Sequence, residues 1–513
     1  MSHPLAGKTT VAVLTMLALL AIPYASPRLA RFRVAKAPWQ KDKDETPVAS
    51  ATAPPPALST GETSLKASSN DGTIANALPT EATAPALDPA VLAKTAGSLA
   101  VEDPQRADGS RALDAFYARL ARTQDKEPGA TTPILHYGDS VIASDYISGT
   151  LRRKFGQKYG DGGHGFILVA NAWEWYFHND VVHYATEGWN ANRITGPLSK
   201  DGAYGLGGVT FHGYAGASAT FGTTDKGDFG RKVSRFDVYY MEQPNGGDAT
   251  VTIGSETTRF SSKGEEKVSR KKSFAVPDGP AKMTLKAVGN GDFRCFGVVM
   301  ERDEPGVSYD ALGALGARMR LWEAQDEAHW KEQMELRQPG LVVLQFGTNE
   351  SEDGWFATDV YEKTVRTVVE KLKRAAPGAS ILILAPLDRA EKADDGSFKS
   401  KKIIKRLLDS QRKVAKEQEV AFWDTFTAMG GEGSMARWVK ATPQLASWDL
   451  THPTPAGAEV IGDLLFKALS SGLEAFRSRH PKGLPPRASA SAARSASPAP
   501  SGAPSAAPSA SAP

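Results

Sequence analysis

The middle of the chain alternates short apolar runs with longer amphipathic stretches. The runs contain almost no polar residues, as expected for parallel strands that are buried on both faces. The last amphipathic stretch follows Thr454, a helix-capping residue type, and has Pro455 in its first turn. This alternation predicts an α/β fold in which helices flank a parallel sheet. The predicted strands cover 133–135, 341–346, 381–384 and 420–423, and the predicted helices cover 112–122, 145–158, 359–374, 401–418 and 455–476.

Residues 186–302 break this alternation. Short runs rich in β-branched and aromatic residues are separated by turns such as Asn245-Gly246-Gly247, and little helical periodicity is present. The pattern predicts an antiparallel β-sandwich of jelly-roll type. We therefore expect an α/β domain formed by 106–185 and 303–480, into which the sandwich is inserted.

The two ends of the chain differ in composition from the middle. Residues 37–105 are rich in Ala, Pro, Ser and Thr, and 481–513 are mostly Ala, Ser and Pro. Such segments bury too little apolar surface to fold, so we expect a disordered linker and a disordered tail. Residues 1–36 contain the uncharged stretch 9–27, which predicts an N-terminal membrane anchor or signal segment.

The expected location of the protein is the cell envelope. An uncleaved inner-membrane anchor is favoured because no Ala-x-Ala-like cleavage site follows the apolar stretch; the folded domains would then lie in the periplasm, or be secreted if the segment is cleaved. One observation opposes this topology. Arg28, Arg31, Arg33 and Lys36 follow the stretch, and the positive-inside rule places such a flank in the cytoplasm. Long domains can cross a membrane regardless of flanking charge, so the topology stays open.

Charge and cysteine content narrow the function classes. The chain has 61 Lys and Arg against 58 Asp and Glu, a formal net charge of +3, which is too balanced to indicate nucleic-acid binding. The single cysteine, Cys295, lies in an apolar run, which predicts a buried thiol. No metal site is predicted, because the 9 histidines are scattered and His178 and His183 lack helical i, i+4 spacing. No cofactor and no obligate protein partner are evident.

Three short segments carry the residue types of nucleophilic catalysis. His136-Tyr137-Gly138-Asp139-Ser140 follows an apolar run and precedes a helical stretch, which places Ser140 on a strand-to-helix turn where helix-start N–H groups can face an oxyanion. Gly347-Thr348-Asn349-Glu350 follows a buried strand, and Asp449-Leu450-Thr451-His452 precedes the last helix. Each segment alone is also typical of an ordinary turn or helix cap. Because loops at the carboxyl ends of parallel strands converge, the three together predict one Ser-His-Asp site.

These segments resemble sequence blocks of the SGNH (GDSL-type) hydrolases, namely Gly-Asp-Ser, Gly-x-Asn and Asp-x-x-His. The stretches HYGDSVIASDYISGTLRRKFGQKYGDGGHGF, YDALGALGA and LQFGTNE are similar to bacterial peptidoglycan O-acetylesterases of this superfamily. The resemblance covers roughly residues 131–475. Val141 replaces the Leu of the motif's name and Glu350 replaces a frequent Asp, but neither change removes a group that the mechanism needs.

The resemblance implies a serine esterase that removes O-acetyl groups from a cell-envelope glycan, with peptidoglycan as the expected substrate. Ser140 would be the nucleophile, His452 the general base, and Asp449 the residue that orients the imidazole. The oxyanion hole would be formed by the Ser140 N–H, the Asn349 amide and, by resemblance, the Gly316 N–H.

Two other functions stay open. An O-acyltransferase could use the same triad to pass the acyl group to a sugar hydroxyl, and a glycan-binding envelope protein would need no catalysis. In the resembled esterases, a carbohydrate-binding-module-like domain occupies a position comparable to 186–302. Aromatic residues near this segment could stack on sugar rings or pack between the domains. These residues are Trp173, Trp175, Tyr176, Phe177 and Trp189.

Overall fold

The computed structural model describes residues 73–75, 100–353, 357–481 and 483–484. All of them belong to one compact unit that spans Pro55–Pro513. The predicted anchor or signal segment and most of the predicted linker and tail lie outside the described residues. Within the described part of the chain, no helix combines the length and the apolar character needed to cross a membrane.

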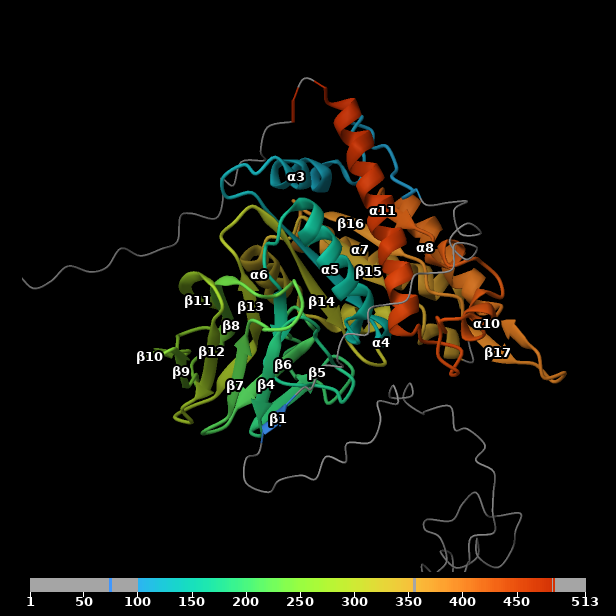
Figure 1. Ribbon diagram of the computed structural model, residues 1–513. Helices are drawn as coiled ribbons and strands as arrows, with labels where there is room; N and C mark the ends of the chain where they lie inside the picture. Colours follow the sequence, from blue (N-terminus) through green and yellow to red (C-terminus); the bar gives the residue numbers. More distant parts are fainter. Residues whose placement is uncertain (1–72, 76–99, 354–356, 482, 485–513) are drawn as a thin grey trace, which may run out of the picture. The chain divides into compact units, whose positions relative to one another are not determined.

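A parallel sheet forms the centre of the α/β domain (Figure 1). It has five strands in the order β14-β2-β15-β16-β19, and all of its strand pairs are parallel. Alternate residues of one strand enter separate hydrophobic clusters on the two faces: Val342 and Leu344 enter one, and Leu341 and Val343 the other. Both faces are therefore buried, as the apolar runs predicted. The strands are β2 (Thr131–Gly138), β14 (Gly306–Gly313), β15 (Leu341–Gln345), β16 (Ser380–Leu384) and β19 (Ala421–Trp423).

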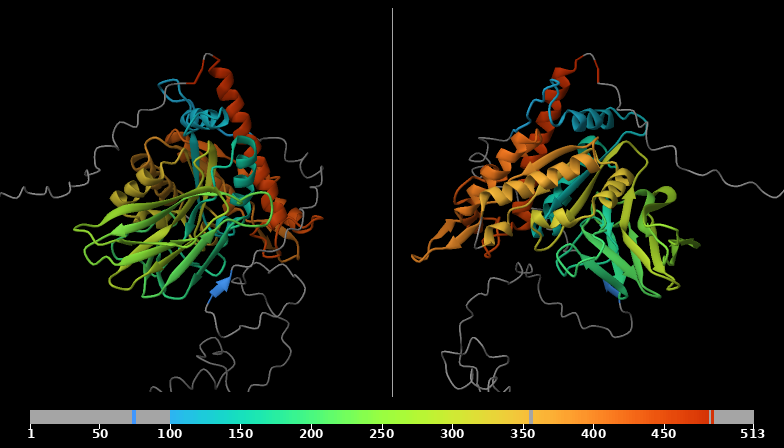
Figure 2. Two further views of the ribbon diagram at one scale, coloured as in Figure 1. Left: turned by 60° about the vertical axis from the view of Figure 1, so that its left-hand side comes forward. Right: turned by 180° about the vertical axis from the view of Figure 1, so that it is seen from behind.

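Helices cover both faces of this sheet. The face seen in Figure 1 carries α3 (Asp114–Gln124), α5 (Tyr146–Tyr159) and α11 (Pro455–Arg479). The opposite face carries α6 (Glu327–Arg337), α7 (Thr358–Ala375) and α8 (Ile403–Glu417), visible from behind in Figure 2. The predicted α/β fold class is thus confirmed. Shorter elements are α4 (Ser140–Ala143), η2 (Met319–Ala324), η3 (Glu350–Glu352), β17 (Ala390–Lys392), β18 (Phe398–Ser400), α9 (Thr425–Ala428) and α10 (Ser434–Val439).

Two antiparallel sheets form the β-sandwich. One has the order β1-β4-β7-β12-β9-β10; the other has the order β11-β8-β13-β6-β5, with β3 paired to β13. The strands are β1 (Thr73–Ala75), β3 (Gly165–Leu168), β4 (Val182–Thr186), β5 (Trp189–Arg193), β6 (Val209–Gly213), β7 (Ser218–Gly222), β8 (Val233–Glu242), β9 (Asp248–Ile253), β10 (Glu256–Ser261), β11 (Val268–Gly279), β12 (Lys282–Ala287) and β13 (Phe293–Glu301).

The sandwich and the α/β domain both begin earlier in the sequence than predicted. Strand β3 lies before residue 186 and β4 begins at Val182, yet both pair within the sandwich. Strand β1, from the segment expected to be a disordered linker, pairs with β4. Glu102 of the same segment exchanges backbone hydrogen bonds with Phe422 of β19. Pairing at a sheet edge uses backbone N–H and C=O groups, which every residue except proline carries in full. It therefore leaves no hydrophobic periodicity in the sequence.

The sandwich shares a hydrophobic core with one face of the parallel sheet. Phe166 and Tyr239 from the sandwich belong to the same buried cluster as Tyr137 of β2 and Trp330 of α6. Cys295 of β13 is also in this cluster, and burial raises the pKa of its thiol to about 12, so the predicted buried thiol is confirmed.

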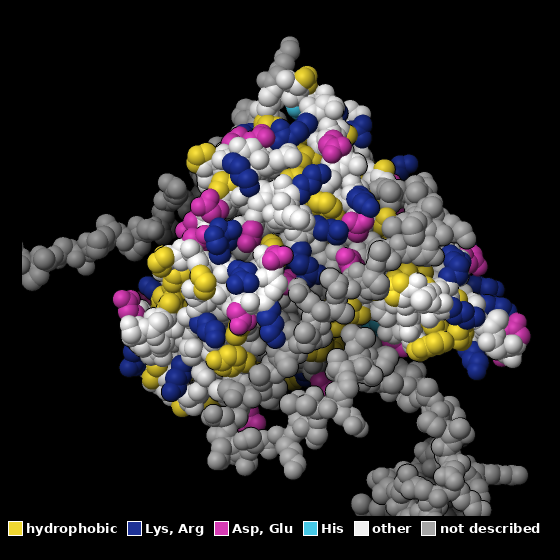
Figure 3. Space-filling view, viewed as in Figure 1, with side chains coloured by type: hydrophobic (Ala, Val, Ile, Leu, Met, Phe, Trp, Pro, Cys, Tyr) yellow, Lys and Arg dark blue, Asp and Glu magenta, His cyan; other side chains and the backbone are white. Residues whose placement is uncertain are grey.

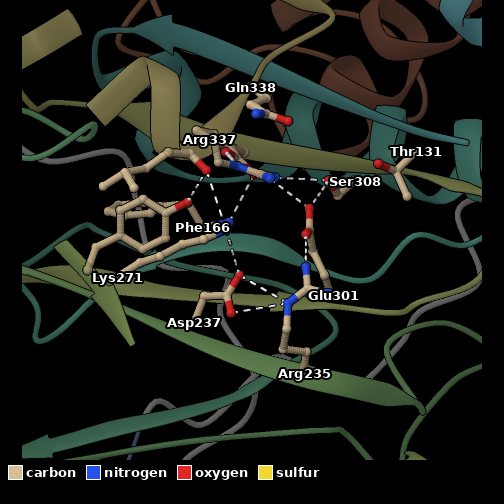
Figure 4. Close-up of polar contacts among 12 residues, drawn as sticks. Thr131, Phe166, Arg235, Asp237, Lys271, Glu301, Ser308, Arg337 and Gln338 are labelled. Carbon is tan, nitrogen blue, oxygen red and sulfur yellow. Dashed lines mark hydrogen bonds and ion pairs between the residues drawn. The ribbon is translucent and has the colours of Figure 1, made fainter. Parts of the chain in front are cut away.

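A buried ionic network joins the two parts of the molecule (Figure 4). Arg337 of α6 pairs with Asp310 of β14 and with Glu301 of β13, each at 2.6 Å, and Arg235 of β8 pairs with the other Glu301 oxygen at 2.7 Å. Burial alone would lower the pKa of Arg337, but the carboxylates of Asp310 and Glu301 raise it, so the guanidinium stays charged. Separating the sandwich from the α/β domain would leave these buried charges without partners, which is costly. The network therefore holds the two parts of the molecule together.

Positive and negative side chains are interspersed on the face shown in Figure 3. Over the upper and left parts of this view, Lys and Arg lie among Asp and Glu, and several Lys and Arg side chains gather at the lower right. This distribution agrees with the balanced composition of the chain.

Candidate active site

Ser140 lies where strand β2 turns into the short helix α4. Asp139 caps this helix, because its Oδ1 accepts the Val141 N–H at 3.0 Å. Ser140 is the first helical residue, and the N–H groups of a first helical turn have no partner within the helix. The strand-to-helix turn that the sequence predicts at Ser140 is therefore present.

The structure brings Ser140, His452 and Asp449 together. Ser140 Oγ lies 2.8 Å from His452 Nε2, and His452 Nδ1 lies 2.7 Å from Asp449 Oδ2. A carboxylate only accepts hydrogen bonds, so Nδ1 carries the imidazole proton and Nε2 can accept from the Ser140 hydroxyl. The arrangement can transfer a proton from Ser140 to His452.

Asp449 is held by a tight turn of its own loop. Its Oδ1 accepts the backbone N–H groups of Thr451 at 2.9 Å and His452 at 3.0 Å. Leu450, between them, has a φ of 58°, which is uncommon for a residue other than glycine. Burial by itself would raise the pKa of Asp449, but the hydrogen bonds from the imidazole and the two N–H groups lower it overall. Asp449 is therefore a carboxylate at neutral pH.

The loops that carry the other predicted residues begin next to Gly138. In the parallel sheet, Gly313 of β14 and Gln345 of β15 are both register partners of Gly138, two residues before Ser140. The Ala314 N–H also donates to the Gly138 carbonyl at 3.0 Å. The loops after β2, β14 and β15 thus leave the same edge of the sheet.

Asn349 and the Gly316 loop are in contact with each other. Asn349 Nδ2 donates to the Ala317 carbonyl at 3.0 Å, which uses one of its two N–H groups. Gly316 is exposed and has a φ of 73°, a conformation that favours glycine. The structure therefore links these two predicted oxyanion residues at the edge where Ser140 lies.

Glu350 connects the same two loops, a role that the sequence did not indicate. Its Oε2 accepts the Gly347 N–H at 3.0 Å and its Oε1 accepts the Met319 N–H at 2.8 Å. Burial, together with the nearby Asp139 carboxyl, raises the pKa of Glu350 to about 7. The only signal in the sequence is that Glu replaces the shorter Asp that often follows this asparagine.

The predicted aromatic residues divide into two groups. Tyr176 is buried and its hydroxyl accepts the Leu168 N–H, while Trp173 and Trp189 pack against the shared core and donate to Thr195 and Ser218. Trp175 and Phe177 are half-buried and contact each other edge-on. The Phe177 N–H donates to the carbonyl of Ala143, the last residue of α4, so this pair lies beside the helix that begins at Ser140.

Trp448 is an exposed aromatic residue that the sequence analysis did not single out. It immediately precedes Asp449 and is 62% exposed. The Leu450 N–H donates to the Ser447 carbonyl at 3.1 Å and the Ser447 N–H to the His452 carbonyl at 2.8 Å, so Trp448 lies on the turn that carries Asp449 and His452.

A buried cluster of Asp145, His164 and His178 has metal-ligand residue types, with ligand atoms within 4.8 Å of one another. Both Asp145 oxygens accept from Arg152 at 2.9 Å, and His164 Nε2 and His178 Nδ1 are 2.9 Å apart in a shared hydrogen bond. Burial lowers the pKa of His178 to about 3, so its imidazole is neutral. The positive charge of Arg152 and the hydrogen bonds that already occupy these ligand atoms favour a structural role for the cluster over metal binding. Sequence spacing did not reveal it because the three residues come from separate segments.

Comparison with known proteins adds to this geometry. Residues 296–460 match the GDSL-like lipase/acylhydrolase family. A search of curated proteins finds no match. Among solved structures, the chain is similar to a peptidoglycan O-acetylesterase, with a TM-score of 0.62 and 23% identity over 74% of this chain and 100% of that chain.

Two further structural matches have TM-scores that are too low to indicate a shared overall fold. One is a family two carbohydrate esterase from Cellvibrio japonicus (TM-score 0.23, 11% identity, 57% of this chain and 98% of that chain). The other is a family two carbohydrate esterase from Clostridium thermocellum in complex with cellohexaose (TM-score 0.25, 10% identity, 56% and 99%).

The chain has the α/β fold of a known esterase, and part of it matches a family of lipases and acylhydrolases. More narrowly, the matched region of the chain is similar to GDSL-like lipases and acylhydrolases, and the chain shares the fold of a peptidoglycan O-acetylesterase. The second and third of the three sequence segments lie within the residues that match this family.

Proposed function

We propose that this esterase removes O-acetyl groups from a cell-envelope glycan, with peptidoglycan as the first candidate. The observation that carries the proposal is the hydrogen-bonded series from Ser140 through His452 to Asp449 at the carboxyl edge of the parallel sheet. Ser140 is also the first residue of α4, and its own N–H is the donor that this turn would offer to an oxyanion.

In the proposed reaction, Ser140 Oγ attacks the acetyl carbonyl while its proton passes to His452 Nε2. Asp449 stabilises the imidazolium that forms, and the Ser140 N–H, the Asn349 amide and the Gly316 N–H stabilise the oxyanion. The bond to the sugar oxygen then breaks, and His452 returns the proton to that oxygen. Water, deprotonated by His452, attacks the acyl-enzyme, releases acetate and restores Ser140.

Two observations support a glycan as the acetylated substrate. A solved structure with the same fold is that of a peptidoglycan O-acetylesterase. In addition, Trp448 presents an exposed aromatic ring one residue from Asp449. An aromatic ring offers apolar area at low entropic cost, which suits contact with the apolar face of a sugar ring.

An O-acyltransferase that uses the same three residues is the second candidate. It would differ only in the acceptor of the acetyl group, a sugar hydroxyl in place of water. A non-catalytic glycan-binding protein is disfavoured by the intact hydrogen-bonded series at Ser140. We further propose a cell-envelope location, either anchored in the inner membrane with the catalytic domain in the periplasm or secreted after cleavage.

The test is release of acetate from an aryl acetate and from O-acetylated peptidoglycan, with Ser140→Ala as the control. Ser140→Ala should lower kcat by about 10³-fold or more and leave the fold unchanged. Near-normal turnover of the aryl acetate by Ser140→Ala would refute the assignment of the nucleophile. Transfer of acetate to an added saccharide, in preference to water, would favour the acyltransferase.

A further inference from the structure

Arg389 lies between the loop that carries Asn349 and the loop that carries Asp449 and His452. It follows strand β16 and is 8% exposed. None of the sequence segments discussed above includes it. Its guanidinium nevertheless contacts both loops.

On one side, Arg389 holds the peptide that leads into Asn349. Its Nη1 donates to the Thr348 carbonyl oxygen at 2.8 Å and to the Ser351 hydroxyl. The Thr348 carbonyl belongs to the peptide bond between Thr348 and Asn349. Because that peptide is planar, a hydrogen bond to its oxygen also restrains the backbone N–H and Cα of Asn349.

On the other side, Arg389 holds the turn between Asp449 and His452. Its Nη2 and Nε donate to Thr451 Oγ1 at 2.8 Å and 3.2 Å, and Thr451 Oγ1 in turn donates to the Asp449 carbonyl at 3.1 Å. The neighbouring Ala390 N–H donates to the Leu450 carbonyl at 3.0 Å. Thr451, between the two proposed catalytic residues, therefore links them to the guanidinium.

We propose that Arg389 is a positioning residue that holds the Asn349 amide and the His452 imidazole at a fixed distance from each other. This proposal rests on the proposed function. The two groups act on the same tetrahedral intermediate, so the distance between them must be set before the substrate binds. A guanidinium is a planar fork with several donors and can bond both loops at once, whereas a lysine ammonium is a point charge without this geometry.

The test is steady-state kinetics of Arg389→Lys on an aryl acetate. We expect kcat to fall about tenfold or more and KM to change less than about threefold, because transition-state geometry is affected and substrate binding is not. Combined with Asn349→Ala, the loss in kcat should be smaller than the product of the two single losses, since both act through the same amide.

Two variants serve as matched controls. Glu352→Gln removes the exposed ion pair to Arg389 at 2.6 Å but leaves both loop contacts, so its kcat should stay within about twofold of the unmodified protein. Arg294→Lys changes an arginine that is also buried, 3% exposed against 8% for Arg389, but is bonded to Asp201 and Thr210 in the sandwich. It should lower the thermal stability without changing kcat.

A kcat of folded Arg389→Lys within about twofold of the unmodified protein, a change in KM alone, or full multiplicativity with Asn349→Ala would each overturn the proposal. If Arg389→Lys does not fold, Thr451→Val decides, because it removes the acceptor of Arg389 on the turn between Asp449 and His452 and should by itself lower kcat with KM unchanged. Failure of the proposed function is a separate result: the unmodified protein would show no turnover that depends on Ser140.

Discussion

Replacement of Glu350 by Gln should remove a pH dependence of stability that originates in the active-site loops. Glu350 is buried, and its two oxygens accept the N–H groups of Gly347 and Met319. Burial and the Asp139 carboxyl raise its pKa from the ordinary value of 4.5 to about 7. The folded protein therefore binds a proton at Glu350 at pH values where the unfolded chain has already lost it.

The sign and size of the effect follow from this shift. A carboxyl whose folded pKa is raised contributes full stability below about pH 4.5, and this contribution is lost as the pH rises through about 7. The difference between a pKa of about 7 and the ordinary value of 4.5 corresponds to at most about 3 to 4 kcal/mol. Gln does not titrate, so the Glu350→Gln variant lacks this loss. Between pH 4.5 and pH 8, the free energy of unfolding of the unmodified protein should therefore fall relative to that of Glu350→Gln by up to this amount.

The measurement is urea unfolding followed by circular dichroism at a helix-sensitive wavelength. All the α-helices among the described residues belong to the α/β domain, so this signal reports the domain that contains Glu350. Glu352→Gln is the matched control, since its side chain is 51% exposed and should show no such gain. A difference between Glu350→Gln and the unmodified protein that stays constant within about 0.5 kcal/mol over this pH range would refute the reasoning.

Three further predictions concern catalysis. Asp449→Asn would favour the wrong imidazole tautomer, so kcat on an aryl acetate should fall about 10³- to 10⁴-fold with an unchanged circular dichroism spectrum; a loss below about tenfold would contradict the role of Asp449. Asn349→Ala should lower kcat about 10²-fold with KM unchanged, and an unchanged kcat would exclude its amide from the oxyanion hole. Trp448→Ala should raise KM for O-acetylated peptidoglycan about tenfold but leave KM for an aryl acetate unchanged. Tyr214→Ala, a change at a similarly exposed aromatic residue of the sandwich, is its control; equal effects of the two variants would contradict a specific sugar contact at Trp448.

The elements that could be predicted from the sequence are those in which the pattern of apolar and polar side chains reflects which positions are buried. The runs that became β15 and β16 are apolar because both faces of the sheet are covered, and Thr454 caps α11 as expected, accepting the Gly457 N–H at 3.3 Å. The proximity of Ser140, Asp449 and His452 followed from their motifs and from strand order. Strand β1 was not predicted, because three residues at a sheet edge are held by backbone pairing and show no periodicity.

Side chains that connect two loops through hydrogen bonds, here called tethers, could not be predicted from the sequence for a different physical reason. A parallel sheet determines where its loops begin, but it does not determine their conformation a few residues further on. At this site Glu350 links the Asn349 loop to Met319 in the Gly316 loop, and Arg389 links the Asn349 loop to Thr451. The Asn349 loop is thus restrained from both sides by long polar side chains that are buried, where an unpaired polar group is costly. Because each tether has its partners only when both loops are in place, the loops should order cooperatively, and the geometry at Ser140 should depend on residues that never touch the substrate.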